Sequence, residues 1–185
     1  MRADIARYYN TGSRPGPLRV LRRVLGKKEI HPVLLFRVGS WIYLEAPRAL
    51  RPLLKFFWWP CNDWISTLYD VHIEVGAKIG PGLYLGHRGG VWINPMSQLG
   101  ENCNISQGVV IGAAGLDVRA PVIGDRVWIG PHAVLTGPLK VGHDCVIGAN
   151  TLVVADVPDK AVVVGVPGRI LSYSGSARLI RLREE

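Results

Sequence analysis

The sequence is poor in cysteine, in clustered metal ligands and in long apolar runs. Its 185 residues include three cysteines, far apart at positions 61, 103 and 145. An odd number at this spacing argues against a disulfide framework and against a zinc site, so we expect no metal. No segment reaches the roughly 18 uninterrupted apolar residues of a membrane-spanning helix, since Arg37 and Gly39 interrupt the best candidate, PVLLFRVGSWIYLEA. The N-terminal MRADIARYYN lacks the apolar core of a signal peptide. These absences predict a cytoplasmic protein.

Acidic residues are scarce in the first part of the chain. Residues 1–70 hold 12 Lys or Arg and 5 Asp or Glu, a net charge of +7, whereas residues 71–185 hold 10 and 9, a net charge of +1. An apolar content of 48% and a charged content of 19% are typical of a folded protein. We therefore expect a basic region over 1–70, a different domain over 71–171 and a short tail over 172–185.

The second region repeats with a period of six residues. Such a period fits neither a helix nor a hairpin meander, but it fits a solenoid of short strands that turn a corner once per repeat and pair with the next coil. The aliphatic side chains, and the small residues four positions after them, should point inward. Cys103 and Cys145 occupy the small position, which predicts buried, inert thiols. The aliphatic positions are Ile73, Ile79, Leu85, Ile93, Leu99, Ile105, Ile111, Ile123, Ile129, Leu135, Val141, Ile147 and Val153.

The repeat is interrupted twice. Just after His87, the step from Leu85 to Ile93 takes eight residues, which predicts a bulge of the kind that re-aims a side chain beside a site. Later, GAAGLDVRAP puts Asp117 where an inward aliphatic residue should be, so this stretch should leave the solenoid as an external loop near 112–121. Loops on a rigid scaffold commonly carry function.

The chain holds its own comparison for His87. His143 occupies the same position of its repeat, two residues after the aliphatic one. His143 and His132 lie in unbroken repeats, and we expect both to be exposed turn residues. Position in the repeat therefore does not by itself make His87 functional.

Four motifs give the chain a family resemblance. They are AKIGPGLYLGHRGG, INPMSQLGENCNISQGVVIG, VIGDRVWIGPHAVLTG and VIGANTLVVADVPDKAVVVGVPGRI. From position 71 to about 171, the sequence resembles the hexapeptide-repeat acyltransferases, above all the serine acetyltransferase branch and related enzymes encoded with polysaccharide genes. The resemblance implies a mainly β protein, a left-handed parallel β-helix preceded by a short α-helical region. It also implies a homotrimer or a dimer of trimers, with acetyl-CoA lying in a groove between two prisms.

The resemblance assigns the catalytic role to His87. The family's histidine lies in the glycine-rich GH segment, which corresponds to LGHRGG in this chain. A hydroxyl is a poor nucleophile until a base removes its proton, and histidine has a pKa close enough to neutrality to serve as that base. No metal is required.

One departure from the family concerns the partner of His87. Where the serine enzymes have a carboxylate, this chain has His72, in YDVHIEV. In an extended strand, Asp70, His72 and Glu74 project from one face. Our hypothesis is that His72 contacts His87, with Asp70 or Glu74 behind it. Alternatively, His72 is a strand-face residue and His87 works through a backbone or water partner.

Two further departures concern the acceptor. Gly86 replaces an acid that helps to hold a substrate ammonium, and Arg119-Ala120 replaces an Arg-His pair that binds a carboxylate. Arg119 could still clamp an anion. Overall similarity favours serine as the acceptor, whereas these losses favour a sugar hydroxyl in polysaccharide or cell-envelope biosynthesis. A non-catalytic hexapeptide scaffold is the contrary class, and it would not need the histidine segment or the loop.

The resemblance also suggests where CoA binds. The family uses backbone amides at successive corners; Ala149 matches one, but Pro131 has no N–H to offer. Gly112 and Ala113 should pass near the thiol end. Further candidates, for the CoA phosphates, are Lys140 and Arg169, the latter of which could equally be a solvated surface residue.

The basic region should be helical. PGPLRVLRRVLGKK, PVLLFRVGSWIYLE and ALRPLLKFFWWP predict short amphipathic helices, broken by prolines. They are rich in aromatics, and two interpretations remain open: docking on an anionic membrane surface, or a cap on the solenoid that buries the aromatics against the first coil or another subunit. No nucleic-acid recognition module is visible. The prolines are Pro15, Pro17, Pro32, Pro47, Pro52 and Pro60, and the aromatics are Trp41, Phe56, Phe57, Trp58, Trp59 and Trp64.

Overall fold

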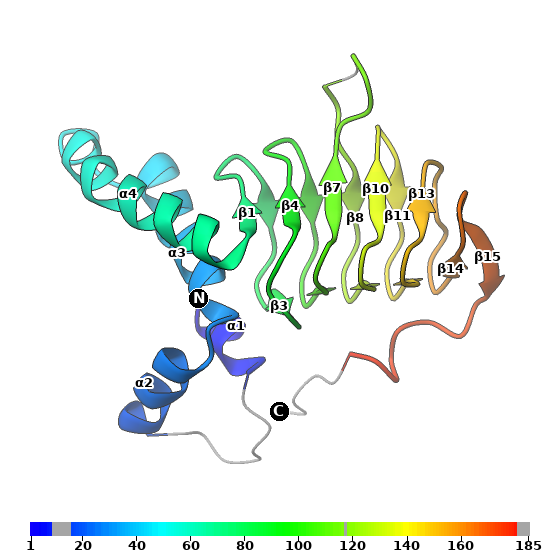
Figure 1. The fold of residues 1–185 in the computed structure, drawn as a ribbon, viewed down its shortest axis with the longest axis horizontal. Helices are drawn as coiled ribbons and strands as arrows, with labels where there is room; N and C mark the ends of the chain where they lie inside the picture. The colour runs from blue at the N-terminus through cyan, green and yellow to red at the C-terminus, as the bar shows by residue number, and fades with distance from the viewer. Residues whose placement is uncertain (9–15, 117, 181–185) are drawn as a thin grey trace.

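The computed structural model describes residues 1–8, 16–116 and 118–180, without the side chains at positions 17, 19, 21, 23 and 25. Asp117 and Pro15 lie outside the described residues. The helices are α1 (Arg2–Ala6), α2 (Pro17–Gly26), α3 (Ile30–Leu44) and α4 (Arg51–Tyr69), and they gather at one end of the molecule (Figure 1). In the part of the chain that is described, no helix is long and apolar enough to cross a membrane.

The prolines shape the helices less than predicted. Pro17 and Pro52 lie in first turns, where a missing N–H costs nothing. The predicted break at Pro60 is wrong, because α4 continues through it to Tyr69. An interior proline costs a helix ~3 kcal/mol. Here Trp58 before it and Tyr69 after it are both buried, and packing on both sides of the exposed Pro60 offsets that cost.

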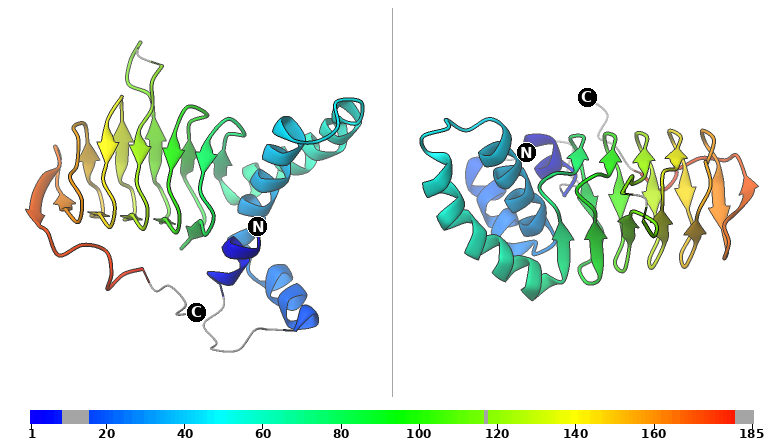
Figure 2. Two further views of the ribbon diagram at one scale, coloured as in Figure 1. Left: turned by 180° about the vertical axis from the view of Figure 1, so that it is seen from behind. Right: turned by 90° about the horizontal axis from the view of Figure 1, so that it is seen from above.

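A three-sided parallel β-solenoid follows the helices, which confirms the predicted fold class. Its sheets have the strand orders β1-β4-β7-β10-β13, β2-β5-β8-β11 and β3-β6-β9-β12-β14-β15, and every pair is parallel except β14 with β15. Figure 2 shows the coils stacked along one axis, away from the helices. The strands are β1 (Val71–Ile73), β2 (Lys78–Ile79), β3 (Tyr84–Leu85), β4 (Val91–Ile93), β5 (Gln98–Leu99), β6 (Asn104–Ile105), β7 (Val110–Gly112), β8 (Val122–Ile123), β9 (Trp128–Ile129), β10 (Val134–Thr136), β11 (Lys140–Val141), β12 (Val146–Ile147), β13 (Leu152–Val153), β14 (Val162–Val164) and β15 (Arg169–Ser172).

The pairing of strands between coils shows how many residues each of the two interruptions of the repeat adds. A regular coil takes 18 residues, as when Val134 pairs with Leu152. The first coil takes 20, because Val71 pairs with Val91. The coil from Val110 to Val134 takes 24, and its six additional residues lie between β7 and β8. Figure 1 shows this segment projecting from the solenoid.

The predicted interior is confirmed. Leu85, Ile129 and Leu135 are fully buried, as are the small-position thiols Cys103 and Cys145. Burial raises the pKa of Cys103 to about 11, so the thiolate is suppressed at neutral pH.

The helices close the first end of the solenoid. Val33 and Phe36 of α3 and Tyr69 of α4 join the hydrophobic core of the first coil. Beside them, Asp4 is fully buried and accepts hydrogen bonds from Arg37 at 2.8 Å and from the backbone N–H of Leu83 at 3.0 Å. A solenoid needs such a cap because its end coil would otherwise leave backbone groups and apolar side chains uncovered.

The cap leaves most of its aromatics uncovered by the first coil, whereas their burial against another subunit stays a prediction. Trp58 is the only one of the six that is buried; its ring lies against Gly39 of α3 and its indole N–H donates to the Leu35 carbonyl at 2.9 Å. The other five, Trp41, Phe56, Phe57, Trp59 and Trp64, are between 46% and 72% exposed. For the four on α4, namely Phe56, Phe57, Trp59 and Trp64, the reason is that the helix turns its other side, with Trp58, toward α3.

Candidate active site

His87 lies in a corner that contains two residues too many. The strand pairing continues through Gly86, whose N–H bonds to the next coil at 2.8 Å, and it resumes where Gly108 donates to the Gly89 carbonyl at 2.7 Å. His87 and Arg88 are therefore the inserted pair. The predicted bulge is a corner insertion rather than a strand bulge, and it includes His87 instead of following it.

The inserted pair is anchored on one side by the helices. The Arg88 guanidinium lies 4.8 Å from the centre of the Tyr69 ring of α4, and its Nε lies 3.9 Å from the Glu29 carboxylate. His87 is exposed and has no hydrogen-bond or ion-pair partner among the described residues. One inserted residue thus holds the corner, and the other presents an unengaged imidazole.

Asp70 anchors the other side of the corner. It ends α4 in the left-handed conformation, with φ of 51°. One carboxylate oxygen accepts the backbone N–H of Gly90 at 2.5 Å, and the other lies 3.6 Å from Nε2 of His72. Asp70 therefore joins the end of the helix, the His87 corner and strand β1.

His72 projects outward from β1, as predicted, while Val71 and Ile73 point inward. Its ring stacks on Trp92 with centroids 3.8 Å apart and planes at 17°. No hydrogen bond or ion pair joins His72 to His87 within the described chain. Trp92 was not predicted, although its outward position one coil above His72 could have indicated it.

The second predicted carboxylate lies elsewhere. Glu74 follows the end of β1, where its N–H donates to the Ile93 carbonyl at 3.2 Å, and its side chain is exposed. No ion pair links it to His72 in the described residues. Asp70, not Glu74, is the carboxylate beside His72.

The comparison histidines differ from His87. Nδ1 of His143 accepts the Asp125 N–H at 3.0 Å and lies 3.2 Å from the Asp125 carboxylate. His132 takes a positive φ of 58° in a regular corner. Both are exposed, as predicted.

The predicted CoA residues occupy different sides of the solenoid. Ala149 lies on the same edge as His87; it is exposed, and its N–H is not hydrogen-bonded within the described residues. Gly112 and Ala113 lie at the other edge of the first sheet, where their carbonyls accept from Gly137 N–H and Thr136 Oγ1, each at 3.0 Å.

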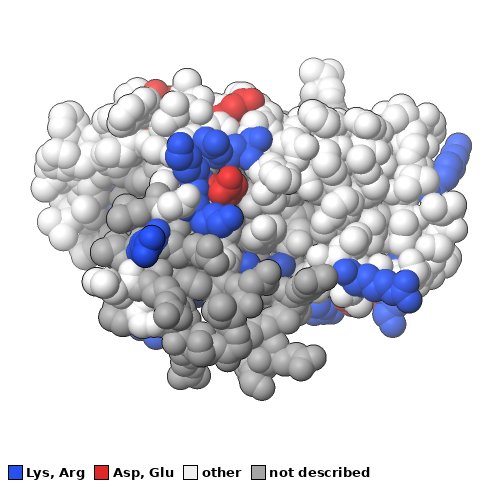
Figure 3. All heavy atoms as spheres, turned by 60° about the horizontal axis from the view of Figure 1, so that its bottom comes forward, with Lys and Arg blue, Asp and Glu red and all other residues white. Residues whose placement is uncertain are grey.

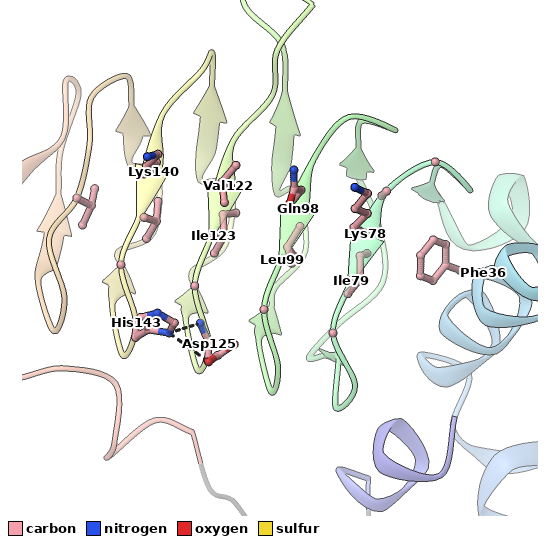
Figure 4. A pocket seen from close by; sticks show the side chains of 18 of the residues that line it. Phe36, Lys78, Ile79, Gln98, Leu99, Val122, Ile123, Asp125, Lys140 and His143 are labelled. Carbon is pink, nitrogen blue, oxygen red and sulfur yellow. Dashed lines mark hydrogen bonds and ion pairs between the residues drawn. The ribbon is translucent and has the colours of Figure 1, made fainter. Parts of the chain in front are cut away.

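Lys140 lies on the second sheet, in an open groove of about 1210 Å³. Figure 4 shows Lys78, Gln98, Val122 and Lys140 projecting into it in a row. Arg169 begins β15 on the third sheet and is exposed. The remaining candidate, Arg119, is exposed in the segment between β7 and β8. One chain therefore does not gather all these residues on one face.

Known proteins share this sequence and fold. The family description "Bacterial transferase hexapeptide (six repeats)" matches residues 120–155. A serine acetyltransferase of Staphylococcus aureus (strain Mu50) is 36% identical over 181 residues, which cover 95% of this chain and 79% of that protein. The chain belongs to the serine acetyltransferase family. The family's Mycobacterium tuberculosis protein is 37% identical over 147 residues, 78% of this chain but only 61% of that protein.

Solved structures of the family agree. A Brucella abortus serine acetyltransferase in complex with coenzyme A superposes with a TM-score of 0.78 at 30% identity, covering 94% of this chain and 67% of that one. A Neisseria gonorrhoeae serine acetyltransferase in complex with serine gives a TM-score of 0.72 at 32% identity, covering 92% and 67%. This chain spans less than two thirds of the length of the M. tuberculosis relative.

Proposed function

We propose that this chain is an acetyl-CoA-dependent O-acetyltransferase in which His87 is the general base. The observation that carries the proposal is the inserted corner: it is anchored through Arg88 and Gly90, yet it leaves the His87 imidazole exposed and unpaired. Such an arrangement suits a base that must meet its partner on a substrate. Membership of the serine acetyltransferase family supports the reaction class.

The proposed reaction is a direct transfer. His87 accepts the proton of the acceptor hydroxyl as its oxygen attacks the thioester carbonyl of acetyl-CoA. The tetrahedral intermediate expels the CoA thiolate, the His87 imidazolium gives that thiolate the proton it took from the acceptor, and the products are the acetyl ester and free CoA. In this proposal, Asp70 and His72 act behind the corner: Asp70 holds Gly90, while His72 forms part of the wall beside Trp92. The remaining alternative is that His72 contacts the His87 imidazole once substrate is bound.

We further propose that the site forms between two copies in a homotrimer or a dimer of trimers. His87 and Ala149 share one edge of the solenoid, whereas Lys140 and Gly112-Ala113 lie beyond the first sheet. In two adjacent solenoids, the edge of one copy that carries His87 and Ala149 would face the second sheet of the other copy. CoA would then accept a hydrogen bond from the Ala149 N–H and run past Gly112 and Ala113, with its phosphates near Lys140 or Arg169.

The acceptor is either serine or a sugar hydroxyl. The family and the serine-bound N. gonorrhoeae structure favour serine. Against this, Gly86 offers no carboxylate to an ammonium, and Ala120 is 7% exposed, so its position offers no side-chain contact to a carboxylate. A charge-assisted hydrogen bond is worth ~1.5–3 kcal/mol, and a neutral sugar would not miss those bonds. Arg119 remains as an anion clamp in either case.

The test is acetyl transfer to a panel of serine, homoserine and nucleotide sugars. Free CoA should be separated chromatographically, because Cys61 is exposed and would react with a thiol reagent. We expect His87→Ala to lower kcat by about 10²–10⁴, the usual contribution of general base catalysis. The matched control is His143→Ala, which removes a histidine from the same repeat position and should retain activity. Equal CoA release by wild type and His87→Ala would contradict the mechanism, and no release with any acceptor would favour a scaffold.

A further inference from the structure

Helix α4 exposes an apolar stripe over its whole length. Leu53, Phe57, Trp64 and Leu68 follow one another at spacings that place them on one helical face, and Phe56 borders them. Their exposed fractions run from 57% to 72%. Single exposed apolar residues are ordinary on protein surfaces, but a contiguous stripe of large ones marks an interaction site.

The stripe is a side of the helix that the fold leaves uncovered. The opposite side of α4 carries the contacts to the rest of the chain, through Trp58 against Gly39 and through Tyr69 against the first coil. Trp59 and Trp41 add exposed indole rings to the same end of the molecule. Water is an unfavourable environment for this much contiguous aromatic surface, so we expect a partner to cover it.

The positive charge of the helical end favours an anionic partner for the stripe. Residues 16–28, which include α2, carry five Lys or Arg and no Asp or Glu, and Arg22, Lys27 and Lys28 are exposed. Figure 1 places α2 and α4 at the same end of the solenoid, remote from β15. Seen from below, Lys and Arg outweigh Asp and Glu over this helical end (Figure 3). Two copies facing each other here would each bring a region of net charge +7 and would repel.

We propose that the helical cap docks on the surface of an anionic lipid bilayer. The α4 stripe enters the headgroup region, where Trp and Phe side chains are favoured, and the basic residues of α2 contact anionic headgroups. Of the five acidic residues in 1–70, Asp4 is buried, Glu29 faces Arg88 and Asp70 is engaged with Gly90. Glu45 and Asp63 are exposed, and the 12 Lys or Arg of this region outnumber them. The proposal concerns attachment and is independent of which acceptor His87 serves.

The experiment is co-sedimentation of the full chain with vesicles of phosphatidylcholine alone or mixed with phosphatidylglycerol. We expect at least about tenfold stronger partitioning to the anionic vesicles, weakened by added salt. Phe57→Ser/Trp64→Ser should lower it by about tenfold or more, and Lys27→Glu/Lys28→Glu should abolish the preference for anionic lipid. The matched control is Leu171→Ser/Tyr173→Ser, which removes residues that are 71% and 61% exposed at the other end of the solenoid.

Three results would overturn the proposal: no sedimentation of wild type with either vesicle, equal binding by the α4 variant, or a smaller oligomer for that variant in light scattering with vesicle binding unchanged. The last result would make the stripe an interface between copies. Circular dichroism checks that the variants fold. Acetyl transfer to a soluble acceptor should be unchanged in the α4 variant, so failure of docking is distinguishable from failure of the proposed activity.

Discussion

The carboxylate of Asp70 accepts the backbone N–H of Gly90 at 2.5 Å. This contact connects the residue that caps the end of α4 to the corner that carries His87. Its neighbour Arg88 is held by Tyr69 of the same helix. The helical region is thus more than a cover for the solenoid. It holds the inserted corner from both sides, and the position of His87 depends on it.

Removing that contact should slow catalysis without weakening CoA binding. We expect Asp70→Ala to lower kcat by about tenfold or more, because small misplacements of a catalytic group are costly. The KM for acetyl-CoA should change little, since the proposed CoA contacts lie elsewhere. Asp70→Asn, whose amide oxygen can still accept the Gly90 N–H, should recover most of the rate. Steady-state kinetics of the three proteins test this, and an unchanged kcat in Asp70→Ala would contradict it.

The buried pair of Asp4 and Arg37 should make stability depend on acid pH. Burial raises the pKa of Asp4, but hydrogen bonds from Arg37 and from the Met1 amino group outweigh it and hold the pKa below its ordinary value. A lowered folded-state pKa means that the carboxylate stabilises the protein above the unfolded-state pKa of 3.8 and that this stability is lost as pH falls further. Denaturant unfolding between pH 3 and 6 would measure it.

Asp4→Ala separates this effect from other carboxylates. The variant leaves Arg37 without its partner and the Leu83 N–H without its acceptor, which should cost ~3–5 kcal/mol at neutral pH. Its loss of stability on acidification should be shallower than that of wild type. A wild-type slope in Asp4→Ala would show that other groups dominate the acid response.

The three thiols should differ sharply in reactivity. Cys61 is exposed, whereas Cys103 and Cys145 are buried, and burial raises the pKa of both. We expect one equivalent of a thiol reagent to react with the native protein and three with the unfolded protein. Cys61→Ser should leave the native protein unreactive. Rapid labelling of that variant would mean that the solenoid interior opens.

Gly39 should not tolerate a side chain. A Cβ there would lie 2.4 Å from Cζ2 of Trp58, so the ring would have to move. Helix propensity favours Gly39→Ala by ~1 kcal/mol, but overpacking typically costs ~1–3 kcal/mol, and we expect net destabilisation. The matched control is Gly26→Ala, at a helical position where nothing lies within 4 Å. Chemical denaturation followed by Trp fluorescence compares the two, and equal stability would contradict the packing argument.

The solenoid could be predicted because the same kind of residue recurs at the same position of each six-residue repeat. Leu85, Ile105 and Ile129 recur at one position of the period and all point inward, so burial of one side chain per repeat was readable without tertiary information. The two interruptions could also be found in the sequence, because the distance between successive aliphatic positions exceeds six residues there. The family resemblance indicated His72, and alternation along the strand placed both Asp70 and Glu74 on its face without deciding between them; the structure shows that Asp70 is the neighbour.

Sequence alone therefore determined the period, the interior and the short segment in which His87 lies, because these depend on contacts between residues that repeat along the chain. Only the tertiary structure decided which residues form the insertion, that Arg88 packs on Tyr69, that Asp70 holds Gly90, and that α4 runs through Pro60 with its aromatics outward. Those contacts join the helical region to the first coil at a single place, and no periodic pattern encodes how two different kinds of structure meet.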